Sequence, residues 1–271
     1  MTSHLDLPEG LTDKRLIFSV ATGRCGTAYL AELFKFLPRV DSHHEPVPEF
    51  ADVMRSALRS PTEATEFLLS RKLTGVAKSP MPTYAETSHL FCKGFLEPML
   101  NLGLRPDIVA LSRPAREVAL SMVGLGTIPG RSDKGLRFYL SPDDPDVLPI
   151  RGGGELNDYQ VCYWYCLEMA RRTDVYEALC RERGCRYVRV TLAGISRLRG
   201  FRFLIKQLEL PGPSLRGWLQ YLVYHRNRVN ESGPGKKSVG PPPDLYALEK
   251  DVQKRVRDAC AQTDLETPQD D

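Results

Sequence analysis

Residues 15–37 form the stretch that most constrains the fold of this chain. An apolar run from Leu16 to Val20 is typical of a strand buried on both faces, as in a parallel sheet. A loop with Gly23 and Gly26 follows, and apolar residues then recur over 29–37 at the spacing of a helix that buries one face. This order directs backbone N–H groups and the positive end of a helix dipole at one point. We therefore predict an anion site in the loop.

The side chains of this loop indicate a phosphate site of a particular kind. Arg24 adds a fixed positive charge with a planar donor fork, and Thr27 adds a hydroxyl at the helix start. The loop of nucleoside-triphosphate enzymes needs Lys and then Ser or Thr after its second glycine, whereas Thr27 and Ala28 follow Gly26 here. On the residues alone, the alternative is an ordinary glycine-containing turn with a surface arginine.

The ten residues from Ala21 to Leu30, ATGRCGTAYL, resemble the 5′-phosphosulfate loop of sulfotransferases that use 3′-phosphoadenosine 5′-phosphosulfate (PAPS). In that family the loop often reads Lys or Arg, then Ser-Gly-Thr, then an aromatic residue. Cys25 stands where the family usually has Ser, and Ala28 where it often has Thr; both departures weaken side-chain contacts and keep the backbone cradle. The resemblance implies that the co-substrate is bound by Gly23, Arg24, Cys25, Gly26, Thr27 and Ala28.

A second motif, LSRPAREVALSM, spans residues 111–122. A predicted strand ends in Arg113, a proline opens a helix, and Ser121 lies eight residues after the arginine. The pattern resembles the 3′-phosphate site of the same sulfotransferases, and it follows the first loop in the right order at a separation of about ninety residues. The resemblance implies that Arg113 and Ser121 hold the 3′-phosphate of PAPS. The residues alone also fit an N-capped helix with a surface salt bridge.

The sequence His43-His44-Glu45-Pro46 supplies the candidate acid–base group. A sulfuryl acceptor must lose a proton, which a carboxylate or imidazole near the sulfate can take. The resemblance implies that Glu45 is this base, since a His-Glu-Pro sequence here looks like a bacterial branch of the superfamily. The small-molecule branch uses a histidine further on, so His44, and more distantly His89, are the reserve candidates. A surface or helix-capping carboxylate is the alternative for Glu45.

Residues 84–89 place another carboxylate, Glu86, near a predicted strand end. This segment either lines the acceptor site or supplies turn and N-cap chemistry for the next helix.

The end of the strand before Arg113 argues against a kinase. A nucleotide kinase needs a strand-end carboxylate that holds magnesium, and this strand ends in Ser112-Arg113. We therefore expect no metal. A small-molecule kinase or another P-loop nucleotide-binding protein stays open as an alternative. So does a non-catalytic nucleotide-binding module, which would tolerate the loss of Glu45.

The periodicity along the chain predicts an α/β fold. Buried strands alternate with helices, which indicates a mainly parallel sheet with helices on both faces, the three-layer arrangement of P-loop proteins and sulfotransferases. We predict a single domain over residues 1–271, with inserted or flexible segments at 126–157 and 230–243. The predicted strands are 16–20, 38–42, 83–86, 107–112 and 186–191, and the predicted helices include 48–59, 61–71, 90–102, 114–125 and 158–183.

Composition limits the partners. The 37 basic and 34 acidic residues give a net charge of +3, so we expect no nucleic-acid binding. Seven scattered cysteines indicate a reducing compartment, and the absence of a long apolar run predicts no membrane span, so we expect a cytoplasmic protein. The expected acceptor is a small molecule or carbohydrate with a hydroxyl or amine. The sequence indicates neither its identity nor an oligomeric state.

Overall fold

The computed structural model describes residues 7–228 and 244–266. The chain divides into two compact units, one formed by Met1–Arg113 and Thr173–Gly233 and the other by Pro114–Arg172 and Pro234–Asp271. Helix α8 (Asp158–Glu182) passes through a boundary between them and contributes residues to both. The single domain predicted over 1–271 stays a prediction, and the predicted segment 230–243 lies outside the described residues.

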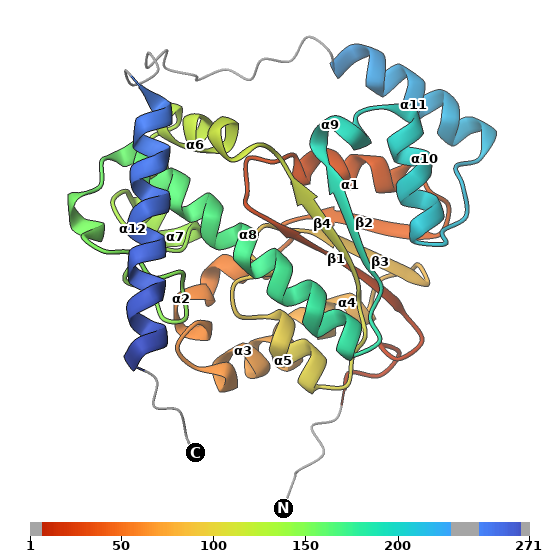
Figure 1. Ribbon diagram of the computed structural model, residues 1–271. Coiled ribbons are helices and arrows are strands. Elements are labelled where there is room, and N and C mark those ends of the chain that lie inside the picture. The colour runs from red at the N-terminus through yellow and green to blue at the C-terminus, as the bar shows by residue number, and fades with distance from the viewer. Residues whose placement is uncertain (1–6, 229–243, 267–271) are drawn as a thin grey trace, which may run out of the picture. The chain divides into compact units, whose positions relative to one another are not determined.

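The first unit contains a five-stranded sheet in the order β2-β3-β1-β4-β5 (Figure 1). Each neighbouring pair is parallel, and Phe18 of β1 lies opposite both Glu86 of β3 and Ile108 of β4. This confirms the predicted parallel α/β architecture. The strands are β1 (Arg15–Ala21), β2 (Val40–His44), β3 (Thr83–Thr87), β4 (Asp107–Ser112) and β5 (Tyr187–Thr191).

One face of this sheet carries an aliphatic core. Because side chains alternate along a strand, Ile17 and Ala21 of β1 point to the same face, where they belong to one buried cluster with Leu30 and Phe34. The periodic residues predicted for the first helix therefore meet the sheet as expected. The helices of this face are α1 (Thr27–Lys35), α9 (Leu192–Ile195), α10 (Leu198–Gln207) and α11 (Leu215–Arg228).

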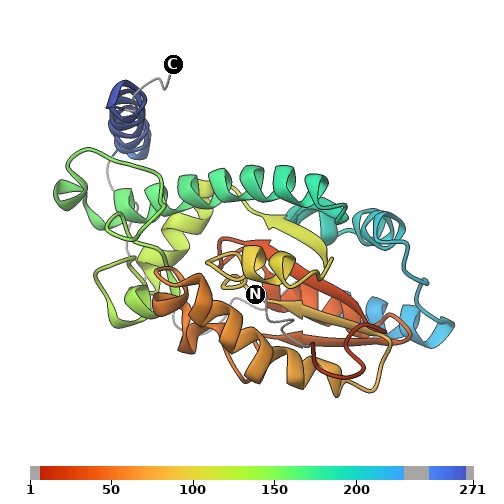
Figure 2. The same cartoon turned by 90° about the horizontal axis from the view of Figure 1, so that it is seen from below.

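The opposite face is covered by aromatic side chains. Phe18 of β1 stacks on Phe91 with ring centroids 4.4 Å apart, and Phe50 packs on Phe95 at 4.6 Å. Figure 2 shows α3 and α4, in orange, beside the strands on this face. Helices therefore cover both faces, as predicted. The segments here are η1 (Phe50–Asp52), α2 (Met54–Ala57), α3 (Pro61–Phe67), the π-helical turn η2 (Leu68–Lys72), α4 (Leu73–Ala77) and α5 (Leu96–Asn101).

The second unit is helical in its described part. It contains α6 (Ala115–Gly124), α7 (Asp133–Phe138), η3 (Gly153–Glu155), the first part of α8, and α12 (Leu245–Glu266). Glu249 of α12 accepts hydrogen bonds from Arg116 Nε at 2.8 Å and from the Tyr159 hydroxyl at 2.5 Å. These charge-assisted bonds connect α12 to α6 and α8.

The segment 126–157, predicted as inserted or flexible, contains more secondary structure than its composition indicated. It contains α7 and η3, and its Tyr139 and Leu140 side chains are buried. Trp164 of α8 donates from Nε1 to the main-chain oxygen of Leu148 at 3.0 Å. Short helical turns leave too few repeats for periodicity to reveal, which explains the difference.

Two elements begin or end at residues other than those predicted from the sequence. The helix predicted over 90–102 begins only at Leu96, because Gly94 has a left-handed φ of 96° and packs against the backbone of Ala57. Strand β2 ends at His44, two residues later than predicted. No helix within the described ranges is long and apolar enough to cross a bilayer.

Candidate active site

The candidate residues follow the strands of the sheet at their carboxyl ends. All neighbouring strands are parallel, so these ends lie along one edge. The chain leaves β1 toward β2 on one side and leaves β4 toward β5 on the other, so its direction across the sheet reverses between the adjacent strands β1 and β4. Open α/β sheets bind ligands in the crevice at this reversal. The residues that follow β1 and β4 are those of the two predicted phosphate motifs.

Residues 22–26, which we call the anion loop, have an unusual backbone. Gly23, Arg24 and Gly26 all have left-handed φ angles, of 82°, 55° and 98°. Loops with left-handed residues next to right-handed ones can turn successive backbone N–H groups toward one side, as anion-binding loops do. Gly26 is also the N-cap of α1 and supplies no side-chain cap, and the first turn of α1 has no acidic residue. The left-handed positions at Gly23 and Gly26 are those that the two glycines predicted, and anion binding by the loop stays a prediction.

The side chains of the anion loop divide into buried and exposed groups. Cys25 is fully buried, and burial raises the pKa of its thiol, so this residue can offer an anion only its backbone N–H. Thr27 is also buried, and its main-chain oxygen accepts a hydrogen bond from the Thr87 hydroxyl at 2.9 Å. Arg24 and Ala28 are exposed. Arg24 is therefore the charged side chain of this loop that reaches solvent.

Arg113 lies beside the anion loop. Its Nη1 donates a hydrogen bond to the main-chain oxygen of Arg24 at 3.2 Å, across 89 residues of sequence. The structure thus brings the arginine of the second motif to the first motif. Ser121 lies on α6 in the second unit and is half-buried, so its predicted pairing with Arg113 stays a prediction.

Glu45 follows β2 directly and has a left-handed φ of 47°. Its Oε1 accepts hydrogen bonds from His89 Nδ1 at 2.7 Å and from Ser88 Oγ at 3.3 Å. Burial raises its pKa, but the hydrogen bond from His89 and the nearby charge of His44 outweigh this and hold the pKa at about 2. With 27% of its side chain exposed, Glu45 is an accessible carboxylate that is ionised at neutral pH.

Two histidines flank this carboxylate in different ways. His44 donates from Nδ1 to the main-chain oxygen of Thr87 at 2.7 Å, which leaves its Nε2 3.9 Å from Glu45 Oε2. His89 must carry its proton on Nδ1, because the Glu45 carboxylate can only accept. Burial and the charge of Lys93 lower the pKa of His89 to about 4. The sequence ranked His89 behind His44, yet His89 makes the shorter contact, because β3, which precedes His89, pairs with β2, which precedes Glu45.

Glu86 does not line an open site. Its carboxylate is buried and accepts from Lys72 Nζ at 2.8 and 3.1 Å and from the Tyr84 hydroxyl at 2.8 Å. Burial raises the pKa of Glu86. Of the two alternatives left open for residues 84–89, exposure of this carboxylate to an acceptor is therefore not what the structure shows. Sequence reasoning missed Lys72, since a lysine at the end of a helical pattern gives no sign of burial.

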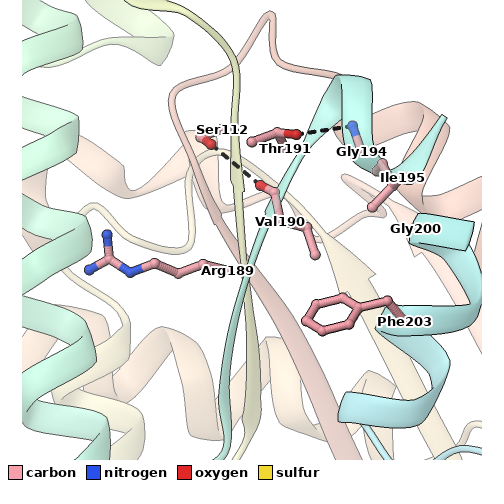
Figure 3. A pocket seen from close by; sticks show the side chains of 8 residues that line it. All are labelled: Ser112, Arg189, Val190, Thr191, Gly194, Ile195, Gly200 and Phe203. Carbon is pink, nitrogen blue, oxygen red and sulfur yellow. Dashed lines mark hydrogen bonds between the residues drawn. The ribbon is translucent and has the colours of Figure 1, made fainter. Parts of the chain in front are cut away.

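A cavity of about 440 Å³ lies at the carboxyl ends of β4 and β5 (Figure 3). In Figure 3, Ser112 and Thr191 lie toward the top of the cavity. The Ser112 hydroxyl lies 3.4 Å from the main-chain oxygen of Val190. The Thr191 hydroxyl accepts a hydrogen bond from the Gly194 N–H at 3.0 Å. Figure 3 shows the ring of Phe203, from α10, directed toward β5. The cavity is lined by Ser112, Arg189, Val190, Thr191, Gly194, Ile195, Gly200 and Phe203.

This cavity adjoins both phosphate motifs. Ser112 immediately precedes Arg113 in the chain. Leu192, which follows the lining residue Thr191, packs so closely on the anion loop that a Cβ at Gly26 would lie 2.6 Å from its Cδ1. Residues next to the cavity lining in the chain therefore include Arg113 and a side chain that packs on the anion loop.

Comparisons with known proteins agree with this architecture. No protein-family model matches the sequence, and no curated protein matches it. Among solved structures, the chain is similar to a sulfotransferase domain from the curacin biosynthetic pathway, with a TM-score of 0.53 and 14% sequence identity. The match covers 94% of this chain and 99% of that domain. The chain therefore has a sulfotransferase-like α/β fold.

Proposed function

We propose that this protein is a sulfotransferase that moves a sulfuryl group from PAPS to a hydroxyl or amine acceptor. The observation that carries the proposal is the hydrogen bond from Arg113 to the anion loop, at the reversal point of a sulfotransferase-like fold. It brings a permanent positive charge to a backbone concavity that suits phosphate. The resemblance of both motifs to the PAPS sites supports the same assignment.

The positive charge of Arg113 beside the anion loop favours sulfuryl transfer over phosphoryl transfer. A kinase at this place holds magnesium with a carboxylate, which neutralises the triphosphate. Here β4 is followed by Arg113, which repels a metal ion and attracts a further phosphate. A nucleotide with a 3′-phosphate supplies that additional anion. We assign Arg113 to this 3′-phosphate, and Arg24 and the loop N–H groups to the 5′-phosphosulfate.

The adjoining cavity suits the nucleoside. Phe203 is 49% exposed and offers an aromatic face on which a base can stack. The cavity volume of about 440 Å³ lies within the range of small-ligand pockets. Its lining includes the hydroxyl residues Ser112 and Thr191, and Ser112 immediately precedes Arg113 in the chain. We therefore place the adenosine of PAPS in this cavity, with its phosphates toward the anion loop.

Glu45 and His89 form the proposed acid–base pair. The acceptor oxygen or nitrogen bonds to sulfur, the bond from sulfur to the bridging phosphate oxygen breaks, and the acceptor proton passes to Glu45. A pKa of about 2 makes this carboxylate a weak base in the chain without ligands. Nearby phosphate and sulfate charges would raise the pKa values of both Glu45 and His89, because like charge disfavours the carboxylate and favours the imidazolium. Bound PAPS would thus strengthen the base.

The first test of the proposal is nucleotide binding by calorimetry. We expect 3′-phosphoadenosine 5′-phosphate to bind at least about tenfold more tightly than AMP, since a charge-assisted contact to the 3′-phosphate contributes roughly 1.5 to 3 kcal/mol. ATP with magnesium serves as the kinase comparison. Preferential binding of ATP with magnesium would assign the site to a kinase, and equal binding of 3′-phosphoadenosine 5′-phosphate and AMP would remove the role of Arg113.

A transfer assay then tests catalysis. PAPS carrying radioactive sulfur is incubated with the protein and a panel of alcohols, phenols, sugars and amines, and labelled product is separated from PAPS. Nucleotide binding without transfer to any of these acceptors would favour the non-catalytic module.

A further inference from the structure

Lys72 makes an unusual set of buried contacts beside the turn that carries Glu45. Its Nζ lies 2.8 and 3.1 Å from the two oxygens of Glu86 and donates to the main-chain oxygen of Pro46 at 3.2 Å. The ammonium also lies 4.3 Å from the centre of the Phe50 ring. Lys72 is 2% exposed and Glu86 is 1% exposed. All three N–H donors of the ammonium are therefore matched by acceptors, two on Glu86 and one on Pro46.

The contact to Pro46 holds the peptide group between Pro46 and Val47, one residue beyond Glu45. Pro46 is the next residue in the chain, and Glu45 itself has a left-handed φ of 47°, which a non-glycine residue seldom adopts. Surrounding contacts must hold such a conformation in place. On the other side, His89 and Ser88 hold the Glu45 carboxylate. Lys72 thus anchors the backbone next to Glu45, whose side chain is held separately.

The local helix geometry is what delivers the ammonium to this place. Lys72 is the last residue of the π-helical turn η2, which lies between α3 and α4. A π-helical turn holds one more residue than an α-helical turn, so it rotates the side chains that follow it. Such turns occur often at functional sites. Leu68 and Leu73, which lie at the start of this turn and directly after it, are also buried. A regular helix through this segment would direct residue 72 elsewhere.

A buried ion pair is a weak source of stability. Two well-packed apolar side chains of similar volume often stabilise a core as well or better, because charges lose hydration when they are buried. Packing alone therefore does not account for Lys72 and Glu86. An apolar residue at 72 would fill the space but could not donate to the Pro46 oxygen, and Glu86 supplies the acceptors for the other N–H groups of the ammonium.

We propose that Lys72, supported by Glu86, is a positioning residue that sets the orientation of Glu45 through the Pro46 peptide. This proposal rests on the proposed function, in which Glu45 takes the acceptor proton. Loss of the anchor leaves the carboxylate present but displaced from its catalytic orientation. The described hydrogen bonds of Lys72 go to Pro46 and Glu86, whereas the residues assigned to the nucleotide follow β1, β4 and β5. Replacing Lys72 should therefore leave nucleotide binding unchanged.

The double variant Lys72→Met with Glu86→Gln tests this idea, because it removes both charges with little change in volume. We expect turnover per folded molecule to fall about 10-fold to 100-fold, the effect of a displacement of about 1 Å in a catalytic group. The Kd for 3′-phosphoadenosine 5′-phosphate should stay within about twofold of the parent value. The imidazole Nδ1–H signal of His89 in NMR should also shift, since it reports the bond to Glu45.

A matched control is the buried ion pair of the second unit. Arg172 and Glu168 have side chains that are 8% and 0% exposed, and the variant Arg172→Met with Glu168→Gln removes a comparable pair away from Pro46. It should lower stability to a similar extent without changing turnover per folded molecule or the His89 signal. Unchanged turnover and an unchanged His89 signal in the Lys72 variant would overturn the proposal. If the parent protein shows neither nucleotide binding nor transfer, the proposed function fails, and the His89 signal alone still decides whether Lys72 positions Glu45.

Discussion

The guanidinium of Arg113 and the main chain of Arg24 are joined by a hydrogen bond of 3.2 Å. This contact connects the loops after β1 and β4, the two strands between which the direction of the chain reverses. One of the five donors of the guanidinium makes this bond, and the group carries a permanent charge that the carbonyl does not neutralise. This hydrogen bond therefore holds the charged guanidinium of Arg113 beside the anion loop.

Arg113→Ala should reduce nucleotide discrimination. We expect the preference for 3′-phosphoadenosine 5′-phosphate over AMP to fall by at least about tenfold, because a charge-assisted contact worth roughly 1.5 to 3 kcal/mol is lost. AMP binding should change less, since AMP lacks the 3′-phosphate. Calorimetry with both nucleotides measures the effect, and Arg105→Ala, which changes an arginine outside the site, is the control. A preference that survives Arg113→Ala would place the 3′-phosphate elsewhere.

Arg24→Ala should lower turnover more than it lowers nucleotide affinity. Arg24 is an exposed side chain on the anion loop, and a donor directed at the leaving oxygen gains strength as negative charge develops there. Arg24→Lys should recover part of the rate because it retains the charge. Steady-state kinetics alongside calorimetry separates the two effects. Full activity in Arg24→Ala would exclude the residue from the mechanism.

Gly26→Ala should damage the anion loop. Gly26 has a φ of 98°, and an added Cβ would lie 2.6 Å from Cδ1 of Leu192. The backbone conformation alone disfavours alanine by on the order of 1 kcal/mol, so both the loop and the adjoining cavity should be disturbed. We expect weaker binding of 3′-phosphoadenosine 5′-phosphate with a modest loss of stability. Gly103→Ala, at a φ of 85° with nothing near its Cβ, controls for backbone strain alone. Equal nucleotide affinity in both variants would argue against a role for the loop.

The local parts of this fold could be predicted from sequence. The apolar run of β1 and the helical spacing of α1 involve neighbours in the chain, so periodicity reveals them. The same is true of β4, where Arg113 follows the last strand residue. The backbone of the anion loop was also predictable, because Gly23 and Gly26 indicate left-handed positions.

Contacts between distant segments could not be predicted in the same way. The bond between Glu45 and His89 depends on β3 lying between β2 and β1, and strand order leaves no mark on periodicity. The pairing of Lys72 with Glu86 depends on a π-helical turn, which a regular helical pattern hides. The family resemblance indicated residues that follow the strands, but it could not show which of them make contact.

Glu45→Gln should retain nucleotide affinity and lose turnover. The amide preserves the size of the side chain but cannot take a proton, so we expect a loss on the order of 10² to 10⁴, the usual effect of a positioned proton acceptor. His44→Ala should cost less, because His44 bonds to the Thr87 main chain and lies 3.9 Å from Glu45. Turnover with a working acceptor is measured next to calorimetry. Normal turnover in Glu45→Gln with a collapse in His44→Ala would transfer the role to His44, and normal turnover in both would make His89 the next residue to replace.

Acidification should destabilise the protein through His89. Its pKa is about 4 in the folded chain and 6.5 ordinarily, so between these values the unfolded chain binds a proton that the folded chain does not. The free energy of unfolding therefore falls as pH decreases from 6.5 to 4, by up to about 3 kcal/mol. Glu45, with a pKa of about 2 against 4.5 ordinarily, extends the loss to lower pH, because its folded form resists protonation.

Urea unfolding at a series of pH values measures this dependence. His89→Gln should flatten the curve between pH 6.5 and 4, because glutamine does not titrate, although its stability at neutral pH will also change. His225→Gln, on α11, leaves the Glu45 and His89 pair unchanged and should keep the slope of the parent protein. The slope is the informative quantity, since the linkage relation makes it depend on the difference in bound protons and not on the packing lost in each variant. A parent slope that survives in His89→Gln would mean that another group is responsible for the acid sensitivity.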